Sequence, residues 1–213
     1  MHWYSVFFDS PIMVDAAKNS AYVAAASAAV AIVLGLLAAV ALTRYRVRGA
    51  SVLTGLIVMP IVLPALLLGI SLLSFFSKVG VALSLGTVIV GHVLVTLPFV
   101  VLTLNARLAG FDRSIEEAAD TLGATRLQTF RHITFPLIRP SVIGAALLVV
   151  ALSLDEFIVT FFTIGTGNTL PIVIWGQMRA GVSPVVNAVS TLMLLATVVL
   201  VVAVGRMTDV RFR

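Results

Sequence analysis

Two adjacent carboxylates, Asp155 and Glu156, stand inside a long apolar stretch of the sequence. If a helix begins near Pro140, they lie about 22 to 24 Å along its axis, towards the outer half of a bilayer. Ionisable groups at such depth cost roughly 2.5 to 3.5 kcal/mol and usually face a cavity or pathway. The carboxylates could equally bind a neighbouring helix or cap a broken one. As pathway residues they would attract a cation, with Phe157 and Phe161 as nearby aromatic faces.

A second polar stretch, "EEAADTLGATRLQTFRHITFP", extends from residue 116 to residue 136. Its helical period predicts a short amphipathic helix that ends at Gly123, because glycine permits a sharp bend. A second short helix, about 126–132, would leave at an angle before the chain returns to the membrane. Acids and alanines replace the basic and bulky residues of helices that lie on lipid. The stretch therefore favours docking to a protein, with Glu117 free to pair with a base or to cap, through a low surface that includes Ala118, Ala119, Gly123 and Ala124.

A third polar surface lies in the last apolar run, where Asn187, Ser190 and Thr191 recur within one helical turn. These side chains could line a pathway. Small polar residues also hydrogen-bond between membrane helices, and this alternative stays open. Between the carboxylates and this run, Trp175 and Met178 are expected to pack an outer loop or short helix, or to anchor it at the membrane surface.

The elements that position these residues are membrane helices. The chain has 213 residues, of which 60% are hydrophobic and 11% are charged, against roughly 25% charged in soluble domains. A bilayer needs about 20 apolar residues per helical span. We predict an all-α membrane protein without a soluble domain. Its five expected spans are about 20–42, 51–76, 82–104, 140–164 and 184–204.

The cations predict how these spans are oriented. Short loops rich in Lys and Arg stay in the cytoplasm. One side of the membrane would receive only Lys18, Lys78 and Arg179, so the N-terminus is expected outside and the C-terminus inside. The net charge of +5 then reflects topology rather than nucleic-acid binding. The cytoplasmic side would receive the remaining cations, which are Arg44, Arg46, Arg48, Arg107, Arg113, Arg126, Arg131, Arg139, Arg206, Arg211 and Arg213.

The sequence lacks the residues that several kinds of chemistry require. There is no cysteine, and the three histidines, His2, His92 and His132, are not at metal-ligand spacings. No metal site is expected, and His92 is expected to make an interhelical hydrogen bond. No phosphate-binding G-x-x-x-x-G-K-[ST] motif is present, so a partner must bind any ATP. We expect no enzyme activity in this chain.

The stretch after Glu116 resembles the EAA loop of permease subunits of type I ABC importers. That pattern is E-A-A, three residues, G, nine residues, I-x-L-P, and Phe135 stands here in place of the leucine. The resemblance implies a six-span permease fold over residues 1–213, with a coupling loop at about 110–138. It also implies docking to a homodimeric ATPase that binds ATP and Mg, a second permease subunit and an external binding protein. The implied coupling residues are Glu117, Ala118, Ala119, Asp120, Leu122, Gly123 and Ala124.

Three further pieces, "SLDEFIVTFF", "TLP" and "GVSPVVNAVST", resemble the permeases for spermidine and putrescine within that family. The resemblance implies polyamine import, while relatives for phosphonates or opine-type compounds share much of the pattern. An ion-coupled secondary transporter would also use intramembrane carboxylates, but it leaves the EAA stretch unexplained. The expected pathway residues are Asp155, Glu156, Phe157, Phe161, Asn187 and Thr191.

An exported N-terminus is unusual here, because residues 1–20 do not resemble a signal peptide. We therefore expect that a sixth span precedes Met1 in the native gene. The expected location is the bacterial plasma membrane, which is the inner membrane in a Gram-negative cell.

Overall fold

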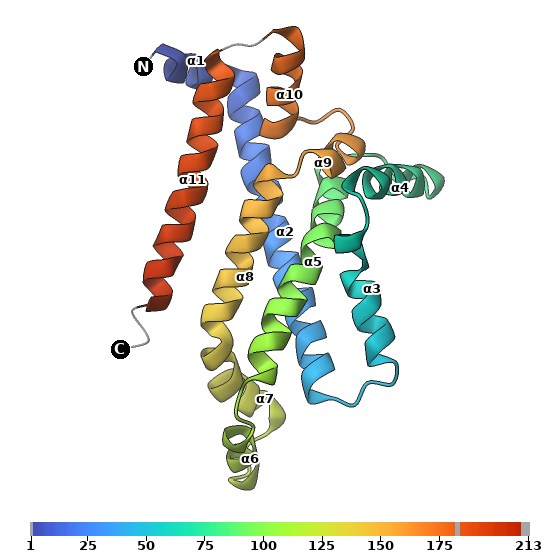
Figure 1. The fold of residues 1–213 in the computed structure, drawn as a ribbon, viewed down its shortest axis with the longest axis vertical. Coiled ribbons are helices and arrows are strands. Elements are labelled where there is room, and N and C mark those ends of the chain that lie inside the picture. The colour runs from blue at the N-terminus through green and yellow to red at the C-terminus, as the bar shows by residue number, and fades with distance from the viewer. Residues whose placement is uncertain (1, 182–183, 210–213) are drawn as a thin grey trace.

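The computed structural model describes residues 2–181 and 184–209, and the described chain is helical without strands (Figure 1). Two predicted cytoplasmic cations, Arg211 and Arg213, lie outside the described residues. The helices are α1 (His2–Asp9), α2 (Pro11–Arg44), α3 (Ala50–Val62), α4 (Ala65–Lys78), α5 (Leu85–Ala109), α6 (Ser114–Thr121), α7 (Arg126–Thr129), the π-helical segment η1 (Phe130–Thr134), α8 (Phe135–Asp155), α9 (Ile158–Thr163), α10 (Leu170–Ala180) and α11 (Pro184–Asp209).

The centre of the molecule is the packed group of α2, α5 and α8 (Figure 1). Small residues of α2 allow the helices to approach closely, as is common between membrane helices. At Gly35, an added Cβ would lie 2.4 Å from Val100 of α5, so only glycine fits. The buried cluster between the three helices consists of Ala28, Ala31, Ala39, Val93, Val100, Leu104, Leu108, Ile138, Ala145 and Val149.

The second predicted span, 51–76, is not straight. It consists of α3 and α4, whose axes differ by 109°. The break lies at Leu63 and Pro64, which both have extended backbone. A residue before proline is driven out of the α conformation, so the helix ends there.

The fourth predicted span, 140–164, is wrong at both ends. The helix begins in the predicted coupling stretch and continues over Arg126–Asp155, through α7, η1 and α8. The second helix of the coupling stretch begins at Arg126 after the turn at Gly123, as predicted, but it does not end near residue 132. A π-helical turn directly before Pro136 accommodates a residue that lacks an N–H, so the chain does not have to break there. Beyond Asp155 the helix stops, and α9 is a separate short helix.

By length and composition, three described helices could cross a membrane: α2, α5 and Arg126–Asp155. The bent pair of α3 and α4 makes a fourth if it counts as one span. The fifth predicted span corresponds to α11, whose described apolar part, Pro184–Val199, is shorter than 18 residues. The structure thus supports three or four of the predicted spans.

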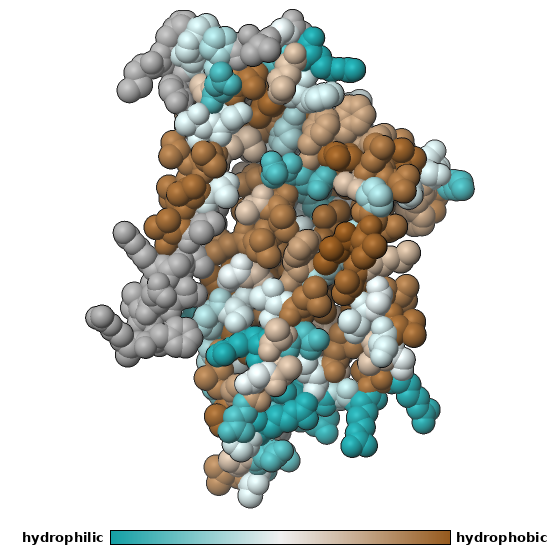
Figure 2. Space-filling view, in the orientation of Figure 1, coloured by the Kyte–Doolittle hydropathy of each residue, from teal (hydrophilic) through white to brown (hydrophobic). Residues whose placement is uncertain are grey.

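Charged residues gather at one end of the molecule, around α6 and α7, below a broad apolar middle (Figure 2). This end carries the C-terminal residue of α2, Arg44, and the arginines of the segment between α5 and α8. Lys18 and Arg179 lie in the elements at the opposite end, α2 near its start and α10 (Figure 1). The described cations are therefore separated as the positive-inside rule requires.

Candidate functional site

The predicted coupling stretch forms a projection beyond the ends of α2, α5 and α8 (Figure 1). Its first helix, α6, is capped by Asp112, whose Oδ1 accepts a hydrogen bond from the Ser114 N–H at 2.9 Å. This hydrogen bond holds the pKa of the Asp112 carboxyl below its ordinary value. The helix ends as predicted at Gly123, which has φ +85°, a left-handed conformation that favours glycine.

The tip of the projection presents large apolar side chains outward. Leu122 is 88% exposed and Leu127 is 74% exposed. Leu122 was among the predicted coupling residues, whereas Leu127 was not, because its exposure depends on how α7 follows α6. Ala119, by contrast, is buried, so it does not belong to the predicted low surface. Glu117, Ala118, Asp120 and Gly123 are exposed, and Ala124 is half-buried.

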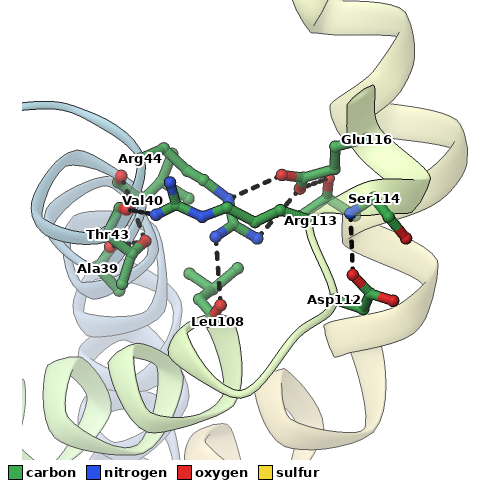
Figure 3. Close-up of polar contacts among 10 residues, drawn as sticks. Ala39, Val40, Thr43, Arg44, Leu108, Asp112, Arg113, Ser114 and Glu116 are labelled. Atoms are coloured by element: carbon green, nitrogen blue, oxygen red, sulfur yellow. Dashed lines mark hydrogen bonds and ion pairs between the residues drawn. The ribbon is translucent and has the colours of Figure 1, made fainter. Parts of the chain in front are cut away.

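A carboxylate that the sequence analysis did not select, Glu116, fixes this projection to the helices above it (Figure 3). Glu116 Oε2 lies 3.0 Å from Arg44 Nε in an ion pair whose N–H is not aligned for a hydrogen bond. Arg44 Nη2 donates to Glu116 Oε1 at 3.2 Å, and the buried Thr134 hydroxyl donates to the same oxygen at 2.6 Å. Both charged side chains are less than a fifth exposed. The pairing with a base that was predicted for Glu117 is thus made by Glu116.

Three further contacts join the end of α2 to α5 and to the projection. Arg44 Nη1 donates to the Leu108 carbonyl at 3.2 Å, and Arg113 Nη2 donates to the Thr43 carbonyl (Figure 3). Arg126 lies over the ring of Tyr45, 5.8 Å from its centroid. A cavity of about 430 Å³ remains between α2 and α6 to η1. The end of α2 and the segment from α6 to η1 thus meet through polar contacts around this cavity rather than through closely packed apolar side chains.

At the other end of the Arg126–Asp155 helix, the two predicted carboxylates differ. Asp155 is exposed, whereas Glu156 is half-buried. Glu156 Oε1 accepts a hydrogen bond from the Val159 N–H at 3.0 Å and so caps the start of α9. Of the alternatives that the sequence left open, capping of a broken helix therefore applies to Glu156.

Asp155 lines a cavity of about 580 Å³ between α8, α10 and α11. Aromatic rings form part of its wall: Phe157 lies 5.3 Å from Trp175, measured between ring centroids. Trp175 and Met178, which were expected to pack an outer loop or short helix, lie on the short helix α10 and line this cavity. From α11, the polar side chains in its lining are Ser190 and Thr197.

Besides Glu156, three predicted pathway residues are not in the lining of this cavity. Phe161 is half exposed and its ring lies 5.7 Å from that of Phe157. Asn187 and Thr191 are exposed on another side of α11, where the Thr191 hydroxyl donates to the Asn187 carbonyl at 2.8 Å. The spacing of polar residues on α11 could not tell which of them face the cavity, because that depends on the rotation of the helix against α8.

His92 makes the interhelical hydrogen bonds that were predicted for it. Its Nδ1 lies 2.7 Å from Ser153 Oγ of α8, and its Nε2 lies 2.7 Å from Thr160 Oγ1 of α9. Within the described residues, no group of three or more His, Cys, Asp or Glu side chains could hold a metal ion.

The family described as binding-protein-dependent transport system inner membrane component matches residues 31–211 of the chain. The chain belongs to this family. The permease is therefore a multi-pass membrane protein and a transport component rather than an enzyme. The predicted membership among the permeases of ABC importers is confirmed.

Two relatives are similar over most of the permease. It is 38% identical over 202 residues to the spermidine/putrescine transport system permease protein PotC of Escherichia coli (strain K12), covering 94% of this chain and 76% of that protein. It is 39% identical over 202 residues to the putrescine transport system permease protein PotI of the same strain, covering 90% and 71%.

A solved structure shares the fold. It is that of a bacterial ABC transporter involved in the import of the acidic polysaccharide alginate, with a TM-score of 0.79 at 16% identity over 100% of this chain and 84% of that chain. The predicted all-α fold of type I ABC importer permeases is thereby confirmed.

Proposed function

We propose that this permease imports polyamines such as spermidine and putrescine, which an external binding protein delivers, at the expense of ATP hydrolysed by partner subunits. The observation that carries the proposal is the cavity at Asp155, together with the similarity to PotC and PotI. One carboxylate in a mostly apolar cavity attracts an ammonium group. The ring of Phe157 and the face of Trp175 that Arg179 does not cover add cation–π attraction of about 0.5 to 2 kcal/mol. The Arg179 guanidinium lies 5.7 Å from the Trp175 centroid.

The proposed substrate pathway is this cavity, with Asp155 and Phe157 as its contacts from the predicted set. The other predicted pathway residues do not line the cavity; they are Glu156, Phe161, Asn187 and Thr191. A phosphonate would carry negative charge into the same cavity, where Asp155 would repel it. Opine-type compounds carry both an amine and carboxylates and remain the second candidate, because an amine alone could meet Asp155.

The proposed coupling loop, about 110–138, docks into a cleft of a homodimeric ATPase that binds ATP and Mg. Exposed Leu122 and Leu127 supply its apolar contacts, and Glu117, Ala118, Asp120, Gly123 and Ala124 surround them. The helix Arg126–Asp155 has 30 residues and is about 45 Å long. It links the loop to the cavity without a break, so a displacement of the loop would move Asp155.

The remaining parts of the proposal concern orientation and partners. The concentration of arginines around α6 and α7 supports a cytoplasmic location for this end. The N-terminus of the chain would then lie outside and the C-terminus inside. Residues 1–213 act as one permease domain beside a second permease subunit, and access to the cavity alternates between the two sides of the membrane.

The test is uptake of labelled spermidine and putrescine by proteoliposomes that contain the assembled transporter and its binding protein. We expect ATP-dependent uptake of at least one polyamine. Asp155→Asn should raise the KM about tenfold or more, which corresponds to about 1.4 kcal/mol. Asp15→Asn, which changes an exposed carboxylate paired with Lys18 on α2, is the matched control and should leave the KM unchanged.

A variant in the coupling loop tests the ATP-driven mechanism separately from the identity of the substrate. Gly123→Trp puts a bulky residue at a left-handed position on the docking surface and should abolish ATP-dependent uptake. Uptake without ATP would overturn the proposed machine. ATP hydrolysis stimulated by an opine-type compound but by neither polyamine would overturn the proposed substrate.

A further inference from the structure

The break between α8 and α9 lies at Glu156 and Phe157, in a stretch without proline or glycine. Glu156 leaves the helical conformation with ψ of 102°. Its carbonyl oxygen accepts a hydrogen bond from the Thr160 hydroxyl at 2.7 Å, and its carboxylate accepts the Val159 N–H. Unsatisfied backbone groups inside a membrane cost several kcal/mol each. Side chains thus satisfy one carbonyl and one N–H at the break, the Glu156 carbonyl and the Val159 N–H.

One buried side chain from a third helix contacts both sides of this break. His92 of α5 is 2% exposed. It bonds Ser153, two residues before Asp155 on α8, and Thr160, in the middle of α9. We define Ser153, His92 and Thr160 as the His92 bridge.

The direction of these hydrogen bonds follows from counting protons. Thr160 has one hydroxyl proton, which it donates to the Glu156 carbonyl. Thr160 must therefore accept from His92 Nε2–H. In a neutral imidazole Nδ1 then carries the lone pair, and it accepts from the Ser153 hydroxyl. Each group in the bridge has a partner without any charge in the apolar interior.

The two helices joined by the bridge differ in their attachment. α9 is held tightly against α4 and α5, because an added Cβ at Gly69 would lie 2.7 Å from Phe162 and one at Gly91 would lie 2.6 Å from Val159. α8 packs in the central group with α2 and α5 and is also continuous with the proposed coupling loop. The bridge thus connects α9 to the helix that carries Asp155.

We infer that His92 is a positioning residue for transport: the His92 bridge sets the angle between α8 and α9 and thereby holds Asp155 opposite the Phe157–Trp175 pair. The inference rests on the proposed role of this cavity. His92 is too far inside the bundle to be an exposed contact, so it acts through Ser153 and Thr160.

The first test compares two substitutions in the assembled transporter. His92→Leu removes both hydrogen bonds, whereas His92→Gln retains one acceptor and one donor. We expect His92→Leu to raise the KM for polyamine uptake about tenfold and His92→Gln to restore it to within about threefold of wild type. Ser153→Ala in the His92→Leu background should add little, because both changes remove the same hydrogen bond of the bridge. Equal KM values for wild type and His92→Leu would overturn the inference.

The second test does not depend on the substrate. The chain has no cysteine, so Leu67→Cys on α4 and Leu148→Cys on α8, both exposed, give two unique sites for spin labels. We expect His92→Leu to broaden or shift the distance distribution between the labels, and His92→Gln to restore it. Identical distributions in all three proteins would overturn the inference. A restored distribution in a transporter that takes up neither polyamine would uphold the bridge and overturn the proposed substrate.

Discussion

At its loop end the helix Arg126–Asp155 bonds to an ion pair of other elements, because Thr134 donates to Glu116. At its cavity end it bonds to a neutral group, because Ser153 contacts His92. At the loop end, the Arg44–Glu116 pair keeps 15% and 18% of its side-chain surface exposed, so water still solvates it. At the cavity end, His92 is 2% exposed, and an ion there would lose nearly all of its hydration. The difference shows how burial selects the chemistry of a contact: ions where water remains, and matched neutral donors and acceptors where it does not.

The largest effect is expected at the charged end, where Glu116 pairs with Arg44. Glu116→Ala leaves the Arg44 guanidinium without its carboxylate, and we expect it to lower the free energy of unfolding by about 2 kcal/mol and to abolish most ATP-dependent uptake. The measurements are thermal unfolding of the purified complex and uptake. Glu117→Ala, one residue further on but exposed, is the matched control and should weaken ATPase binding without lowering stability. Equal losses of stability in the two variants would contradict the anchoring role of Glu116.

At the neutral end, the tight contact between α5 and α9 is the next target. Gly91→Ala places a methyl group 2.6 Å from Val159, and we expect it to cost about 1 to 3 kcal/mol. Gly144→Ala on α8 is the control, since an added Cβ there meets nothing within 4 Å and should change stability by less than about 0.5 kcal/mol. Both are measured by thermal unfolding. A stable Gly91→Ala variant would show that α9 is free to move away from α5.

The aromatic wall of the cavity predicts a smaller effect. Trp175→Ala removes a ring that lies 5.3 Å from Phe157, and loss of about 1 kcal/mol of cation–π attraction would raise the KM for spermidine about fivefold. Trp175→Phe keeps a ring face and should retain most of the affinity. Should Trp175→Ala take up spermidine with the wild-type KM, the ring would be only a packing residue.

The smallest expected effect concerns the cap of α6. The pKa of Asp112 is lowered by its hydrogen bond from Ser114, so this stabilisation is present above the ordinary carboxyl pKa and is lost as the pH falls through the lowered value. Asp112→Ala should speed amide exchange in the first turn of α6 a few-fold at neutral pH. Asp112→Asn keeps the capping oxygen but does not titrate. If exchange in Asp112→Asn accelerates with acid as it does in wild type, another group causes the pH dependence.

Much of the site was predictable where the signal is local. The end of α6 at Gly123 follows from the conformational freedom of that residue. The capping of a broken helix by a carboxylate was an alternative that the pair Asp155 and Glu156 already suggested. Leu127 and Trp175 were harder to assign, because exposure at a tip and position in a cavity depend on neighbouring elements rather than on residue type.

The sequence by itself determined a helical membrane protein, the end at which its arginines gather, and the presence of a bent polar loop, because composition and period act along the chain. Only the tertiary structure decided which carboxylate anchors that loop and what holds the helix break. Arg44 and Glu116 are 72 residues apart, and His92 and Thr160 are 68 apart. Such pairs form only after the helices have packed at a given rotation and depth, and no spacing within one segment encodes that rotation.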